Sequence, residues 1–107
     1  MRRDRIGPTL GALLVALVPG AAGAAEVVAI RIEKLAFTPA EVSAHVGDAV
    51  EWRNDDFVTH TATARDGSWD VTIPPHESRR VVVKAEGKFE YFCKFHPNMV
   101  GRISVQR

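Results

Sequence analysis

The sequence predicts an all-β protein, an antiparallel Greek-key β-sandwich of seven or eight short strands. Apolar and polar residues alternate in short segments, which is the period of a strand that buries one face. Turn-forming residues separate these segments at short intervals, as they do in β-sandwiches. The sequence shows no heptad pattern and no internal repeat. One small all-β domain is therefore expected.

The strands are expected in close succession along the chain. The first is rich in β-branched residues and precedes a break at Pro39. Turns are expected at Gly47 and at residues 54–56, and residues 65–78 form the least regular part. The expected strands cover residues 27–33, 41–46, 49–53, 57–64, 78–84, 88–93 and 100–106.

The first 24 residues have the layout of a secretory signal peptide. Three arginines lie in residues 1–5, an apolar segment follows, and Ala22-Gly23-Ala24 fits a cleavage signal. The apolar segment is shorter than the about 20 residues that span a bilayer. We expect cleavage to leave residues 25–107 as one periplasmic domain with no stable membrane insertion, an uncleaved anchor being the alternative. The net charge of +1 and the lack of a basic stripe argue against nucleic acid as a partner.

The segment from Cys93 to Met99 contains the pattern C-x-x-H-x-x-M, with His96 at its centre. A thiol, an imidazole and a thioether are soft or borderline donors, whereas Mg²⁺ and Ca²⁺ prefer oxygen ligands. One thiolate, imidazole and a weak thioether describe a mononuclear blue-copper site, which also needs a second histidine. Each residue taken alone could equally be a buried hydrophobe, a gap filler or a surface residue. Their joint spacing favours the metal site.

Cys93 is the only cysteine of the chain. An exported domain cannot form an internal disulfide with one cysteine, and a free thiol is a liability in an oxidising compartment. Metal ligation would occupy this thiol. Phe89, Tyr91 and Cys93 share a strand face, so Cys93 is expected to point inward at a strand end. His60 shares a strand face with Val58 and Ala62, so it is also expected to point inward, and it is the candidate second histidine.

At these residues the chain resembles the cupredoxins, the small blue-copper proteins, and most closely amicyanin and the plastocyanin- and pseudoazurin-like bacterial members. The resemblance covers roughly residues 30–105. The matching segments are FTPAEV at 37–42, VGDAVEW at 46–52, the region of His60, EGKFEYFC at 86–93 and CKFHPNM at 93–99. The resemblance implies one type 1 copper ion, with His60, Cys93 and His96 as equatorial ligands and Met99 as the axial ligand.

The expected function is one-electron transfer, with copper cycling between Cu(I) and Cu(II) and no enzymatic step. His96 would be the electron port, beside a weakly adhesive docking patch of Phe95, Pro97 and Met99. The resemblance implies redox protein partners, as in amicyanin, where a dehydrogenase is the donor and a c-type cytochrome the acceptor. We expect a monomer.

Thr61 departs from the family pattern, whereas Pro97, which follows His96, matches amicyanin. Thr61 stands where plastocyanin, azurin and amicyanin have an asparagine that braces the two ligand loops, and a hydroxyl reaches less far. Pro97 has no N–H to offer the Cys93 sulfur, which leaves the thiolate less stabilised and favours Cu(II).

Ordinary structural roles are expected for the remaining polar and aromatic candidates. His45 lies on the polar face of a strand and His76 in a loop, so neither is expected to bind copper. Asp55 and Asp56 are expected to form a solvated turn. Trp52 and Trp69 are expected to anchor the core and a loop, respectively.

Three other functions use similar ligands. A protein for copper delivery or detoxification would need copper that exchanges easily. A zinc-binding structural module would have little use for Met99. A fragment of a multicopper oxidase or nitrite reductase would need further copper centres.

Overall fold

The computed structural model describes residues 24–107. The signal peptide predicted for residues 1–24 therefore lies outside the described residues, apart from Ala24. Within residues 24–107 no helix is long and apolar enough to cross a membrane.

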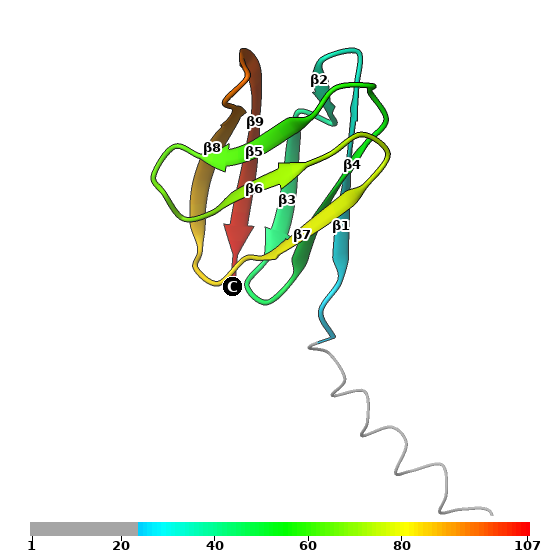
Figure 1. The fold of residues 1–107 in the computed structure, drawn as a ribbon. Coiled ribbons are helices and arrows are strands. Elements are labelled where there is room, and N and C mark those ends of the chain that lie inside the picture. Colours follow the sequence, from blue (N-terminus) through cyan, green and yellow to red (C-terminus); the bar gives the residue numbers. More distant parts are fainter. Residues whose placement is uncertain (1–23) are drawn as a thin grey trace, which may run out of the picture.

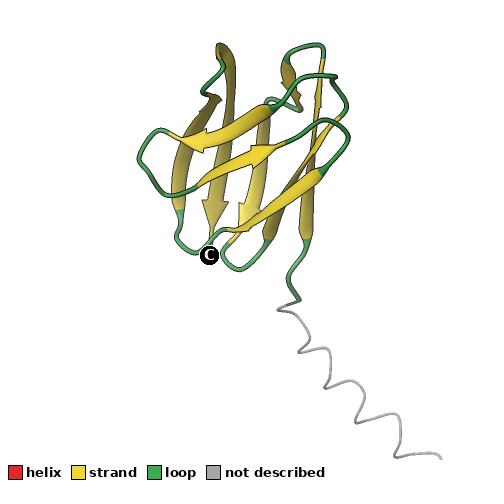
Figure 2. Ribbon diagram, viewed as in Figure 1, coloured by secondary structure: helices red, strands yellow, loops and turns green. Residues whose placement is uncertain are grey.

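Within the described residues 24–107, nine strands form two sheets that pack against each other (Figure 1). The four-stranded sheet has the order β2-β1-β4-β7, with β1 at Val27–Glu33, β2 at Ala36–Thr38, β4 at Ala49–Asn54 and β7 at Ser78–Val82. The five-stranded sheet has the order β3-β9-β8-β5-β6, with β3 at Glu41–His45, β5 at His60–Ala64, β6 at Asp70–Ile73, β8 at Gly87–Cys93 and β9 at His96–Gln106. Strands and loops account for the whole of the described chain (Figure 2).

The predicted β-sandwich is confirmed, with two differences in detail. The sheets are mixed, because β1 pairs with β4 and β3 pairs with β9 in parallel. Side chains alternate between the two faces in both kinds of pairing, so alternation in the sequence cannot distinguish them. The two additional strands are β2, which has three residues, and β6, which lies in the segment expected to be irregular.

The core contains large side chains from both sheets. Tyr91 is fully buried and packs edge-on against Trp52, with ring centroids 5.4 Å apart, and against Phe37, with centroids 4.7 Å apart. Gly101 lies opposite Tyr91 in the β8–β9 pair, and a Cβ at this position would come within 2.3 Å of the tyrosine ring. Glycine is therefore needed there for the tyrosine to lie flat over β9. This contact helps fix the register of the two strands that carry Cys93 and His96.

One end of the sandwich collects the residues expected to bind metal. The β8–β9 turn, the β1–β2 turn and the β4–β5 loop lie at this end, and the C-terminus lies at the opposite end (Figure 1). Because β5 runs antiparallel to β8, the first residue of β5 and the last residue of β8 lie at the same end of the sheet. The antiparallel strand β9 begins there too.

Candidate metal centre

Three strand ends bring the predicted equatorial ligands together. His60 is the first residue of β5, Cys93 is the last of β8, and His96 is the first of β9 and the partner of Cys93 in the sheet register. His60 and Cys93 are completely buried, whereas His96 is partly exposed. The centre therefore has an interior side at His60 and a side open to solvent at His96.

The donor atoms of these residues converge on one point. The Cys93 sulfur lies 3.7 Å from Nδ1 of His60 and 3.7 Å from Nδ1 of His96, and the three donor atoms all lie within 4.8 Å of one another. Zinc bonds to the same donors measure about 2.3 Å to sulfur and about 2.0–2.1 Å to nitrogen, so bond angles of about 110–120° would separate sulfur and nitrogen by about 3.6–3.8 Å. A transition-metal ion would fit between these atoms with little movement of the side chains.

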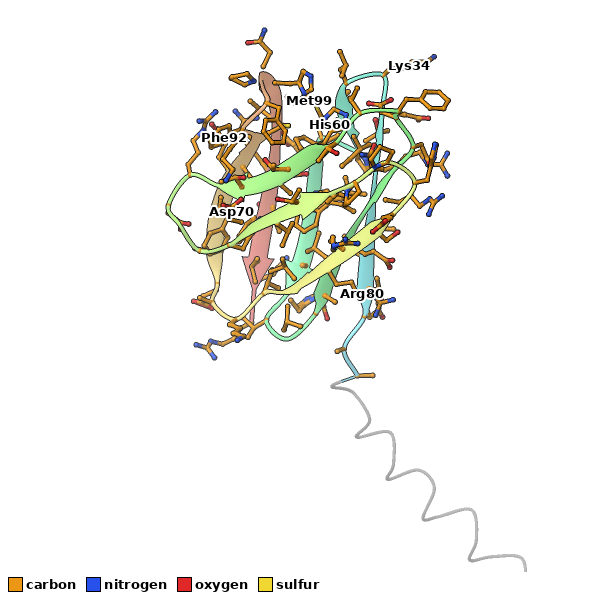
Figure 3. All side chains as sticks on the ribbon, viewed as in Figure 1. Lys34, His60, Asp70, Arg80, Phe92 and Met99 are labelled. Atoms are coloured by element: carbon orange, nitrogen blue, oxygen red, sulfur yellow. The ribbon has the colours of Figure 1, made fainter. Side chains whose placement is uncertain are left out.

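The predicted axial ligand lies at the same end of the sandwich. Met99 is in β9, three residues after His96, and is only 4% exposed. The expectation that Met99 contributes to an exposed docking patch is therefore wrong, because its side chain packs in the core. Figure 3 shows Met99 and His60 close to the end of the sandwich that carries the β8–β9 turn. The thioether belongs to the same buried cluster as Cys93, which suits a weak and long bond to a metal shielded from water.

The residue after His60 holds both the sulfur and the ligand loop. The backbone N–H of Thr61 donates to the Cys93 sulfur at 3.3 Å. The Thr61 hydroxyl oxygen accepts the N–H of Lys94 at 2.9 Å, so this side chain reaches the Cys93–Met99 loop although it was expected to reach less far than an asparagine. Thr61 is 1% exposed, and water therefore cannot replace this bond easily.

The hydroxyl of Thr61 belongs to a closed ring of hydrogen bonds. The Thr63 hydroxyl donates to Asp70 at 2.8 Å, so the proton between the two threonine oxygens, 2.9 Å apart, comes from Thr61. The Lys94 ammonium donates to the other oxygen of Asp70 at 2.8 Å. Hydrogen bonds from Lys94 and Thr63 hold the pKa of Asp70 below its ordinary value. The ring ties β5, β6 and the ligand loop together, and no motif in the sequence indicates it.

The other nitrogen of His60 is bonded to a carboxylate. His60 Nε2 lies 2.9 Å from Oδ2 of Asp56. Burial alone would raise the pKa of Asp56, but hydrogen bonds from the Leu35 N–H, from His60 and from the Lys34 N–H outweigh it and leave the pKa below its ordinary value. The ionised carboxylate can only accept, so Nε2 donates, and in a neutral imidazole this leaves the lone pair on Nδ1, which faces the sulfur.

The expectation of a solvated turn at residues 55 and 56 is therefore wrong for Asp56. Its side chain is 16% exposed and contacts His60, whereas the side chain of Asp55 is 30% exposed and pairs with Arg31 and Arg53. Two adjacent aspartates in a polar turn carry no signal that tells which one faces inward.

The other histidines lie outside the donor cluster. Among residues 24–107, the group of side chains able to hold a metal is His60, Cys93 and His96. His45 is exposed on β3, and the ring of His76 packs against Phe57 with centroids 5.3 Å apart. Trp52 and Trp69 pack in and against the core, with centroids 6.3 Å apart, as anchors would.

Similarity to known proteins shows the family of this chain. The model of the cupredoxin-like domain matches residues 8–105, which is most of the chain. The chain belongs to the cupredoxin-like family. Amicyanin-alpha of Methylorubrum extorquens is 32% identical over 99 residues, covering 87% of this chain and 81% of the relative.

Solved cupredoxin structures have the same architecture. The crystal structure of amicyanin from Paracoccus versutus matches with a TM-score of 0.67 and 26% identity over 80% of this chain and 87% of that one. A purple cupredoxin from Nitrosopumilus maritimus matches with a TM-score of 0.67 and 26% identity over 74% of this chain and 99% of that one. The resemblance to cupredoxins and amicyanin is thus confirmed. Family and donor set together support the predicted class, a type 1 copper electron carrier with one copper ion.

Proposed function

We propose that this cupredoxin is a periplasmic one-electron carrier that holds its copper ion through His60, Cys93, His96 and Met99. The observation that carries the proposal is the convergence of two imidazole nitrogens, each 3.7 Å from one buried thiol sulfur. When bound, the copper ion supplies a one-electron couple between Cu(I) and Cu(II). Redox proteins would deliver and remove the electron.

The ligands would divide into three strong donors and one weak donor. Nδ1 of His60, the Cys93 sulfur and Nδ1 of His96 would be the strong donors to copper, and the Met99 thioether would be the weak one. The strand ends and the hydrogen bonds of Thr61 would hold these residues in place in both oxidation states. A cage that moves little keeps the reorganisation cost of electron transfer small.

Electron entry and exit would use the exposed side of the centre. His96 is the partly exposed ligand, and its neighbour Phe95 is 59% exposed. A small apolar surface suits a partner that must bind briefly and leave quickly. We propose that Phe95 and Pro97 form this docking surface, with a dehydrogenase as the electron donor and a c-type cytochrome as the acceptor.

The chain would divide into a signal peptide and one exported copper domain. Residues 1–24 would be removed as a signal peptide, and residues 25–107 would act as a monomeric copper domain in the periplasm. The single cysteine supports this location, because metal binding would protect its thiol there.

A competition experiment tests the carrier against its main alternative, copper delivery or detoxification. Copper-loaded protein is mixed with a Cu(I) or Cu(II) chelator, and electron self-exchange is measured on the same sample. A carrier loses copper slowly and exchanges electrons rapidly. Rapid loss of copper to the chelator, with slow electron exchange, would favour the delivery protein.

A further inference from the structure

The carboxylate of Asp56 joins the metal centre to a distant turn. Oδ2 of Asp56 accepts from Nε2 of His60 at 2.9 Å and from the N–H of Leu35 at 3.0 Å, while Oδ1 accepts from the N–H of Lys34 at 2.8 Å. The N–H of Asp56 itself donates to the side-chain oxygen of Asn54 at 2.9 Å. Both carboxylate oxygens thus have partners, and the side chain is held in one orientation.

The β1–β2 turn presents its N–H groups to this carboxylate because of its backbone conformation. Lys34 and Leu35 both have positive φ, at 53° and 59°, which non-glycine residues seldom adopt. Successive N–H groups in such a turn can point to one anion. The turn therefore fixes the carboxylate from one side while His60 contacts it from the other.

We propose that Asp56 is a positioning residue of the copper centre, which holds His60 as the Nε2–H tautomer with Nδ1 free for the metal and favours Cu(II) over Cu(I). This inference rests on the proposed function. A carboxylate that accepts from a ligand imidazole fixes the ring orientation and makes the ligand nitrogen more basic. More electron density and a nearby negative charge stabilise the more positive ion, so the carboxylate lowers the reduction potential.

A purely structural role is the competing explanation, since Asp56 also holds the turn. The reduction potential distinguishes the positioning role from the structural role. If Asp56 only stabilised the β1–β2 turn, its loss would change the stability of the protein but not its relative affinity for Cu(II) and Cu(I). Asp55 provides the matched control. It lies in the same loop and carries the same charge, but its side chain pairs with Arg31 and Arg53 rather than with His60.

The first experiment compares Asp56→Asn with Asp55→Asn in the copper-loaded protein. Loss of a carboxylate bonded to a ligand costs about 10–100-fold in metal affinity. If the affinity for Cu(II) falls tenfold while the affinity for Cu(I) is unchanged, the reduction potential rises by about 59 mV for this one-electron couple. We expect this rise in Asp56→Asn and a much smaller change in Asp55→Asn. Equal potentials in the two variants would overturn the proposal.

The second experiment needs no variant and no copper. Nitrogen NMR of the metal-free wild-type protein at neutral pH reports which nitrogen of His60 carries the proton. We expect the proton on Nε2 and a bare Nδ1, and a proton on Nδ1 would overturn the proposal even if the variants fail to fold. A wild-type protein that takes up no copper would instead contradict the proposed function, and the tautomer would still test the role of Asp56.

Discussion

The hydroxyl of Thr61 is expected to stabilise the ligand loop, and Thr61→Val tests this with almost no change in shape. The substitution removes the acceptor for the Lys94 N–H, 2.9 Å away, and the donor to the Thr63 oxygen. It keeps the backbone N–H that bonds the Cys93 sulfur. Because Thr61 is buried, water cannot supply the lost partners. We expect the unfolding free energy of the metal-free protein to fall by about 1–3 kcal/mol, the usual cost of a buried group left without its partner.

The matched control is Thr63→Val, which removes the neighbouring hydroxyl of the same ring. Thr63 is partly exposed, and the Lys94 N–H keeps its bond to Thr61, so the loss should be smaller. Urea titration gives the two free energies, and each kcal/mol lowers the Tm of a domain of this size by about 4–8 °C.

Hydrogen exchange locates the effect in the loop. The Lys94 amide should exchange faster in Thr61→Val than in Thr63→Val, because only the former removes its acceptor. The copper spectrum should remain, since no ligand is changed. Equal stabilities of the two variants, with unchanged exchange at Lys94, would refute the reasoning.

Three further predictions concern the exposed ligand, the docking surface and pH. Added imidazole should restore the copper colour of His96→Gly but not of His60→Gly, because His96 is partly exposed and His60 is buried; equal rescue of both would contradict this. Phe95→Glu should slow electron transfer to a partner protein without loss of copper, whereas Val82→Glu, at a position 49% exposed on β7, should not; equal rates in the two variants would count against the patch. Backbone N–H groups hold the pKa of Asp48 below its ordinary value, so its stabilisation is present above the unfolded-state pKa and is lost as pH falls through the folded-state pKa. Asp48→Asn should therefore flatten the acid side of the stability profile measured by urea titration, and an unchanged slope would contradict this assignment.

The clustering of the candidate donor residues could be predicted, because it depends on local spacing and on which face of a strand each residue occupies. Cys93, His96 and Met99 lie in one short segment, and alternation turned both Cys93 and His60 toward the interior. The β-sandwich itself followed from the same alternation.

The supporting contacts could not be predicted, because they depend on how distant segments meet. Asp56 becomes part of the site through the turn at Lys34 and Leu35, which no local pattern connects to it. The ring that includes Thr61 needs Asp70, on a strand that the sequence did not reveal. The parallel pairing of β1 with β4 could not be predicted either, because apolar and polar residues alternate in the same way in parallel and antiparallel pairs.

The visible absorption spectrum of the oxidised, copper-loaded domain tests the central claim most directly. If His60, Cys93, His96 and Met99 hold one type 1 copper ion, charge transfer from thiolate to Cu(II) should give an intense blue or green colour. Cys93→Ser should remove this band while the β-sheet circular dichroism remains. A wild-type domain that binds Cu(II) but stays colourless would contradict the account.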